Sequence, residues 1–228
     1  LINFGNFENQ QKAILKIHNS LCENGYYIML ECSTDGLDIM NSIRKYFEQL
    51  PPDWLIFHGS KVTTVIDSKQ EEYEMDFFVI NPEAGFVIFE VKGGRLVCKN
   101  NQWYQSGQQG VIRDPVVQAK RARSLTRSHL VKLNFSWAKC INWCCLFPDT
   151  ESRENSFSGS LTPDNLVDSN SLDKLEEKIN RLLELVPKKP EKRISSQDLD
   201  ILTNWLSSNF VPIPSLKREL GKDDKTLI

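Results

Sequence analysis

Apolar residues dominate two neighbouring segments in the first half of the chain and predict a pair of buried β-strands. The segments are Tyr73–Ile80 and Phe86–Lys92, and both are rich in Val, Ile and Phe. Between them lies Asn81–Gly85, whose proline and glycine favour a tight turn over a continued strand. The pattern therefore predicts a hairpin of two strands that are buried in the core.

Hydrophobic periodicity elsewhere predicts helices that alternate with further strands. Apolar residues have helical spacing in five segments, which are about 7–24, 37–50, 115–133, 172–186 and 199–206. Short apolar runs predict strands at about 54–58, 61–66 and 139–147, and either a short strand or an extended link at 26–32. Arg95–Lys99 and Gln102–Gln105 predict a polar hairpin around Asn100-Asn101. This order of elements favours an α/β fold with a mixed central sheet flanked by helices.

Three charged residues stand in the apolar hairpin, where burial is costly unless the charges are paired or bind a metal. Asp76 lies in the first strand, and Glu90 and Lys92 lie in the second. Because strand side chains alternate, Glu90 and Lys92 share one face about 7 Å apart, and the neighbouring strand lies about 5 Å away. The pattern therefore predicts a cluster of two carboxylates and one ammonium.

Carboxylate oxygens of this kind suit Mg²⁺ or Mn²⁺, which keep several waters and also bind substrate phosphates. A nearby lysine can orient an attacking water and stabilise phosphate charge. The cluster therefore indicates metal-assisted hydrolysis of a phosphodiester. The alternative is a structural ion pair of the same residues.

The same residues, Asp76 and Glu90-Val91-Lys92, resemble the signature of the PD-(D/E)XK nuclease superfamily. The sequence around them resembles the NERD (nuclease-related) branch of that superfamily. Glu74-Met75-Asp76 resembles the family's Gly-Glu-x-Asp, with Tyr73 in place of the glycine. Pro51–His58 resembles the family's first strand with its lead-in, and Asp114–Ala119 resembles the Asn-Pro-x-x-Gln-Ala that opens the next helix. The resemblance covers about residues 36–150.

This resemblance implies a restriction-endonuclease-like α/β/α core and a divalent cofactor, Mg²⁺ with Mn²⁺ as the alternative. Asp76, Glu90 and the backbone carbonyl of Val91 would hold the metal. Lys92 would orient the attacking water or stabilise the phosphate, and Gln118 would support the site or a bound phosphate.

The superfamily usually supplies one more acid from a helix before the first strand. Asp38 is the closest match and is expected as a metal ligand, with Asp35 and Glu8 as the other options. Glu74 is a further candidate acid. The sequence leaves the choice among them open.

A basic segment follows the hairpins. Between Pro115 and Pro148 there is no Asp or Glu. The residues expected to contact nucleic-acid phosphates are Lys120, Arg121, Arg123 and Arg127. A solvated helix face that binds nothing is the alternative.

The overall composition changes this picture little. The formal net charge of −2 argues against bulk attraction to nucleic acid, so the local patch matters more. No apolar run approaches the ~20 residues of a membrane span, and no membrane partner is expected. The six cysteines show no disulfide framework, which favours a cytoplasmic protein. Cys140, Cys144 and Cys145 are expected to be buried thiols, with a zinc site as the less favoured reading.

Four regions are expected along the chain. They are a helical extension at 1–35, a nuclease core at 36–150, packed helices at 151–211, and a charged tail or linker at 212–228. The predicted function is a metal-dependent nuclease acting on DNA, with a fused or associated helicase as a partner and a role in DNA processing or antiviral defence implied by analogy. The alternative is an inactive nuclease-like module for DNA binding or assembly. The oligomeric state is left open.

Overall fold

The computed structural model describes residues 27–29, 37–66, 69–152, 161–186, 190 and 192–207. The predicted helix at 7–24 and the tail from 212 lie outside these ranges.

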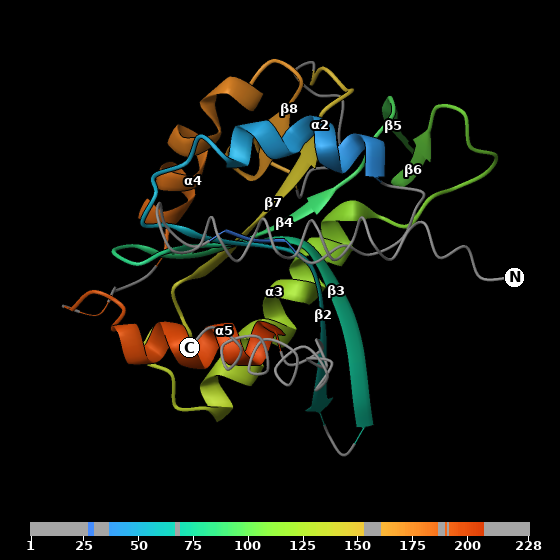
Figure 1. The fold of residues 1–228 in the computed structure, drawn as a ribbon. Coiled ribbons are helices and arrows are strands. Elements are labelled where there is room, and N and C mark those ends of the chain that lie inside the picture. The colour runs from blue at the N-terminus through green and yellow to red at the C-terminus, as the bar shows by residue number, and fades with distance from the viewer. Residues whose placement is uncertain are drawn as a thin grey trace, which may run out of the picture.

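A six-stranded mixed sheet forms the centre of the protein (Figure 1). Its strands, in spatial order, are β1 (Tyr27–Met29), β2 (Leu55–Ile66), β3 (Lys69–Asn81), β4 (Gly85–Val91), β7 (Ile141–Phe147) and β8 (Leu166–Asp168). The pairs β2–β3 and β3–β4 are antiparallel, whereas β1–β2, β4–β7 and β7–β8 are parallel. The predicted hairpin of β3 and β4 is confirmed.

Helices cover both faces of this sheet (Figure 1). The helices are α2 (Leu37–Phe47), α3 (Pro115–Lys132), α4 (Leu175–Glu184) and α5 (Ser196–Ser207), with short 3-10 turns at Pro163–Asn165 and Leu172–Lys174. Helices α2 and α4 pack on one face in one core cluster, and α3 and α5 pack on the other in a second cluster. The predicted α/β/α arrangement is therefore confirmed.

Covering both faces explains why β4 is apolar throughout. Ile88 joins the cluster under α3, whereas its neighbours Val87 and Phe89 join the cluster under α2. All seven residues of β4 are buried, as expected for a central strand packed on both sides. Only a strongly apolar segment can occupy this position, and a charge placed there needs a partner.

Local sequence fixes where α3 begins. The Asp114 carboxylate accepts hydrogen bonds from the backbone N–H groups of Val116 (2.8 Å) and Val117 (3.2 Å). Pro115 occupies the first turn, where its missing N–H costs nothing. The cap and the proline together hold the start of α3 at the edge of the sheet.

Two features differ from the sequence expectation. The strands predicted at 54–58 and 61–66 are one strand, β2, which bends at Gly59 with a φ of 62° and still pairs with β3 on both sides. Strand β8 was not predicted, because its three residues are too few to show a period.

Phe47 ties α2 to the sheet. Its ring stacks on Phe77 with centroids 4.1 Å apart and meets Phe89 edge-on at 5.4 Å. We expect Phe47→Ala to lower the free energy of unfolding by about 3–5 kcal/mol, because it leaves a cavity between α2 and the sheet. Urea unfolding measures this loss. Glu48→Ala in the same segment removes only an exposed ion pair with Arg44, and it should change stability by less than about 1 kcal/mol. Equal losses in the two variants would contradict the assignment.

Candidate active site

The candidate site forms where β3 and β4 separate. Their last backbone pair at this end is Phe77 with Phe89, so Asp76 and Glu90 come directly after the ladder stops. On the other side of β3, the pairing with β2 passes over Gly59 and Asp76. Asp76 is therefore released from regular pairing on both sides, and its side chain replaces a missing backbone partner.

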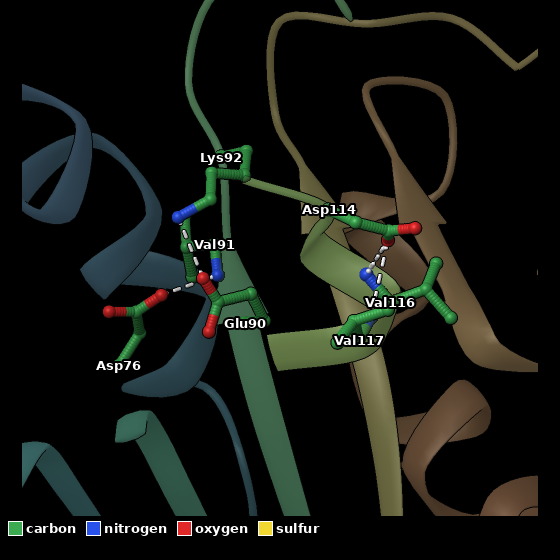
Figure 2. Close-up of polar contacts among 7 residues, drawn as sticks. All are labelled: Asp76, Glu90, Val91, Lys92, Asp114, Val116 and Val117. Carbon is green, nitrogen blue, oxygen red and sulfur yellow. Dashed lines mark hydrogen bonds and ion pairs between the residues drawn. The ribbon is translucent and has the colours of Figure 1, made fainter. Parts of the chain in front are cut away.

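The Asp76 carboxylate is the hydrogen-bond acceptor for the backbone N–H of Val91, in place of a backbone carbonyl. The Val91 N–H donates a 2.6 Å hydrogen bond to Asp76 Oδ2 (Figure 2). In a strand, the N–H and the carbonyl of one residue point to the same side. The Val91 carbonyl is therefore directed to the side of Asp76.

Glu90 and Lys92 form an ion pair on one face of β4. Lys92 Nζ lies 2.7 Å from Glu90 Oε1, and Figure 2 shows both side chains with Asp76 at the same end of the strand. Glu90 is buried with 5% of its surface exposed, whereas Lys92 is partly buried. The predicted shared face of these two residues is confirmed.

The two carboxylates carry more negative charge than their surroundings neutralise. Burial, followed by the charge of Glu90, raises the pKa of Asp76 to about 7, against the opposing effects of the Val91 N–H and Lys92. Burial also raises the pKa of Glu90, although Lys92 opposes this, and Glu74 adds to the rise in both groups. The single lysine therefore does not offset the effect of burial and of the neighbouring carboxylates on the pKa values of these two groups.

A divalent cation would neutralise the negative charge of the Asp76 and Glu90 carboxylates. Mg²⁺ is bound in proteins through one or two carboxylates, with waters and substrate phosphates completing the shell. Asp76, Glu90 and the Val91 carbonyl supply such a set. Among the described residues, no group of three or more His, Cys, Asp or Glu side chains is arranged to hold a metal. A third protein carboxylate would therefore have to come from elsewhere in the chain.

The predicted helix acid stays open. Asp38 lies in the first turn of α2, but its side chain is not described. Asp35 and Glu8 lie outside the described residues. Glu74 is exposed and acts on the site through its charge.

An open pocket of about 680 Å³ reaches the site between β3 and the first turns of α3. Its lining includes Glu90 and Gln118, and Gln118 Oε1 is buried without a hydrogen-bond partner. A buried acceptor without a partner is costly, which marks it for a ligand or an ordered water. The pocket therefore brings the predicted Gln118 to the same place as Glu90.

Tyr73 holds the two walls of this pocket together. Its hydroxyl lies 3.0 Å from Thr126 Oγ1 of α3, in a buried contact. Burial raises the pKa of Tyr73 to about 12, so the phenol stays neutral. The residue that replaces the family's glycine thus has a structural role.

The four predicted phosphate-binding residues are not equivalent. Arg121 lines the pocket and pairs with Glu71 at 2.5 Å. Lys120 lies over the Trp143 ring at 5.3 Å, and Arg127 is exposed. Arg123 is partly buried and donates to the Ile141 carbonyl at 2.9 Å, so its main contact is structural.

Sequence reasoning missed other residues of the pocket. Arg113, Val117 and Glu72 also line it. The signal for Arg113 was its position just before the Asp114-Pro115 helix start, which forms the pocket rim. Val117 gave no such signal, because an exposed valine on a helix has no local mark.

The cysteines in the described part of the chain form no zinc site. Cys140, Cys144 and Cys145 are buried and form no disulfide, as predicted, and burial raises the pKa of Cys145 well above its usual value. These thiols act as small apolar core groups.

The fold and the carboxylate–lysine site define an α/β protein of nuclease-like architecture. Residues 37–148 match the family model of the nuclease-related domain, NERD. The matched segment contains Asp76, Glu90, Lys92 and Gln118. Neither the search of curated proteins nor the search of solved structures found a match. None of the helices in the described ranges combines the length and the apolar composition that a membrane span requires.

The raised pKa of Asp76 predicts how stability depends on pH. Between pH 3.8, its ordinary value, and about 7, the folded protein holds a proton that the unfolded chain releases. The free energy of unfolding therefore falls as pH rises through this window, and the cost is complete above it. Asp76→Asn keeps an acceptor for the Val91 N–H and removes this charge.

We expect Asp76→Asn to unfold at a temperature at least about 2 °C above wild type at pH 8 in EDTA, with a smaller difference at pH 5. Thermal unfolding followed by circular dichroism measures both. Asp173→Asn is the exposed control and should follow the wild type. The same pH dependence in wild type and Asp76→Asn would contradict the prediction.

Proposed function

We propose that this domain is a metal-dependent nuclease that hydrolyses DNA phosphodiester bonds. The observation that carries the proposal is the pair of acids formed by partly buried Asp76 and buried Glu90, beside Lys92 and next to an open pocket. A structural ion pair needs one acid and one base. The second acid, Asp76, has no structural need that an amide could not meet, since its contact is the Val91 N–H.

Each residue then has a defined task. Asp76, Glu90 and the Val91 carbonyl would hold Mg²⁺ or Mn²⁺, which supplies Lewis-acid charge to the phosphodiester when bound. Lys92, released in part from Glu90 once the cation shares that carboxylate, would orient water or stabilise charge on the phosphate. Gln118 would bind a phosphate or a water through its amide.

The substrate would approach along α3. Arg113 and Arg121 line the pocket, and Lys120 is exposed on the same helix. Arginine and lysine neutralise phosphates without reading sequence, so these residues would position the nucleic acid. An association with a helicase, a role in DNA processing or antiviral defence, and a cytoplasmic location extend the same proposal by family analogy.

A second candidate is an inactive DNA-binding module. It is favoured by one observation, namely that the described residues supply two carboxylates and no larger cluster of metal-binding side chains. Such a module would bind DNA equally well with and without a divalent cation.

Two substitutions separate these candidates. Asp76→Ala should abolish Mg²⁺ binding in calorimetry and cleavage of plasmid DNA together. Lys92→Ala should keep Mg²⁺ binding and lower the cleavage rate by at least about 100-fold. Lys174→Ala, an exposed lysine elsewhere on the protein, should leave both unchanged. Wild-type protein that binds DNA without cleaving it would establish the inactive module instead.

The position of Arg121 at the pocket predicts that it contributes to the salt dependence of DNA affinity. If it neutralises one phosphate, Arg121→Ala should reduce the slope of log affinity against log salt by about 0.9. Arg181→Ala is the matched control, because Arg181 also forms an exposed ion pair, with Asp164 on the α4 side. DNA binding measured by fluorescence anisotropy over a salt series gives both slopes. Equal slopes for wild type and Arg121→Ala would remove Arg121 from the interface.

A further inference from the structure

A second, two-stranded sheet stands apart from the central sheet at the end of β4 (Figure 1). It consists of β5 (Leu96–Lys99) and β6 (Gln102–Gln105), joined by Asn100 and Asn101. Both asparagines have positive φ values, 53° and 59°, as in the tight turns that match the twist of a hairpin. The polar hairpin predicted from the sequence is confirmed, and the left-handed backbone of the two asparagines defines its turn.

The inner face of this hairpin is anchored in the core. Trp103 is 1% exposed and packs edge-on against Phe147 at 5.7 Å. Leu96 lies in the same core cluster, which also contains Val116 and Ala119 of α3. The hairpin is therefore fixed relative to the start of α3, which forms one wall of the pocket.

The backbone ties the hairpin to the site at both ends. At one end, only Gly93 to Arg95 separate Lys92 from β5, and Gly94 N–H donates to Asp149 at 2.7 Å. At the other end, Ile112 N–H donates to the Trp103 carbonyl at 2.8 Å. The next residue, Arg113, lines the pocket. Any partner that enters the pocket is thus placed beside the hairpin.

The outer face presents a different set of side chains. Directly opposed residues share a face, so the pairs Val97–Tyr104 and Lys99–Gln102 lie together on this side. Lys99 and Gln102 are exposed, and Val97 is 45% exposed. The Tyr104 hydroxyl donates to Gln102 Oε1 at 2.9 Å, which restrains that carboxamide and leaves its N–H donors and a second acceptor site.

The charge around the hairpin selects an anionic partner. Residues 91–149 contain ten Lys and Arg and two acids, Asp114, whose carboxylate caps α3, and Asp149, whose carboxylate accepts the Gly94 N–H. The whole chain has a formal net charge of −2, so the positive charge is concentrated in this segment. An acidic polymer is favoured here, and a basic partner is disfavoured.

We propose that the β5–β6 hairpin enters a groove of duplex DNA and contacts base edges beside the cleavage site. The inference rests on the proposed nuclease function and adds to it a preference for duplex substrate. A two-stranded ribbon fits the major groove, where glutamine and asparagine amides pair with adenine and an aliphatic side chain contacts the thymine methyl. Gln102, Asn100 and Val97 provide these groups, and Lys99 lies where a flanking phosphate can be reached.

The test compares duplex with single-stranded DNA in the same protein. Lys99→Ala/Gln102→Ala changes two exposed side chains and leaves the Trp103 anchor in place. The control is Lys174→Ala/Gln49→Ala, which removes one exposed lysine and one exposed glutamine elsewhere. Fluorescence anisotropy with a labelled duplex of about 20 base pairs, and with one of its strands, gives two affinities for each protein. Ca²⁺ replaces Mg²⁺ to keep the DNA intact.

We expect the hairpin variant to bind the duplex about tenfold more weakly, with less than a twofold change for the single strand. Its Mg²⁺-dependent cleavage positions on a mixed-sequence duplex should also become more uniform. Equal losses on both DNAs would reduce the hairpin to a general phosphate contact and overturn the groove assignment.

Unchanged duplex affinity with normal cleavage would overturn the inference and leave the proposed function standing. Failure of wild-type protein to bind or cleave any DNA would overturn both. The melting temperature of the variant, compared with that of the control, shows whether a loss comes from unfolding.

Discussion

The arrangement of the site depends on the burial of two like charges at the point where β3 leaves β4. Asp76 accepts a hydrogen bond from the N–H of Val91, and Glu90 forms an ion pair with the ammonium of Lys92. These contacts hold both carboxylates near each other, although burial raises the pKa of each, the charge of Glu90 adds to the rise at Asp76, and the charge of Glu74 adds to the rise at both. A folded chain tolerates such a pair because the surrounding sheet is tightly packed on both faces. The excess charge is then available for a cation, and this is the physical basis of the proposed activity.

The rest of the structure positions groups around that pair. The cap by Asp114 fixes the start of α3, and the contact between Tyr73 and Thr126 holds α3 against β3. Gln118 therefore faces the pocket with a buried oxygen that no protein group satisfies. The same core that contains the first turns of α3 also contains Trp103 of the hairpin. The proposed catalytic groups, the proposed substrate-binding groups and the proposed groove contact are thus parts of one packed unit.

Several of these features were predictable from local sequence. Alternation in a strand places Glu90 and Lys92 on one face wherever the strand lies, and the structure confirms their pairing. The turn at Asn100-Asn101 and the helix start at Asp114-Pro115 follow from backbone preferences of those residues. Other features had no local signal. The separation of Arg121, which reaches the pocket, from Arg123, which bonds the Ile141 carbonyl, depends on which side of α3 meets the sheet.

By itself, the sequence determined the described helices, the described strands apart from β8 and the continuity of β2, the shared face of Glu90 and Lys92, and the resemblance to nuclease-related domains. These follow from periodicity and residue type, which act over a few positions along the chain. Tertiary structure alone decided that β3 and β4 part at Asp76, that Glu74 raises the pKa of both acids, and that Gln118 is left without a partner. The reason is physical: pKa values and hydrogen-bond satisfaction depend on burial and on neighbours that are distant in sequence, and both exist only after packing.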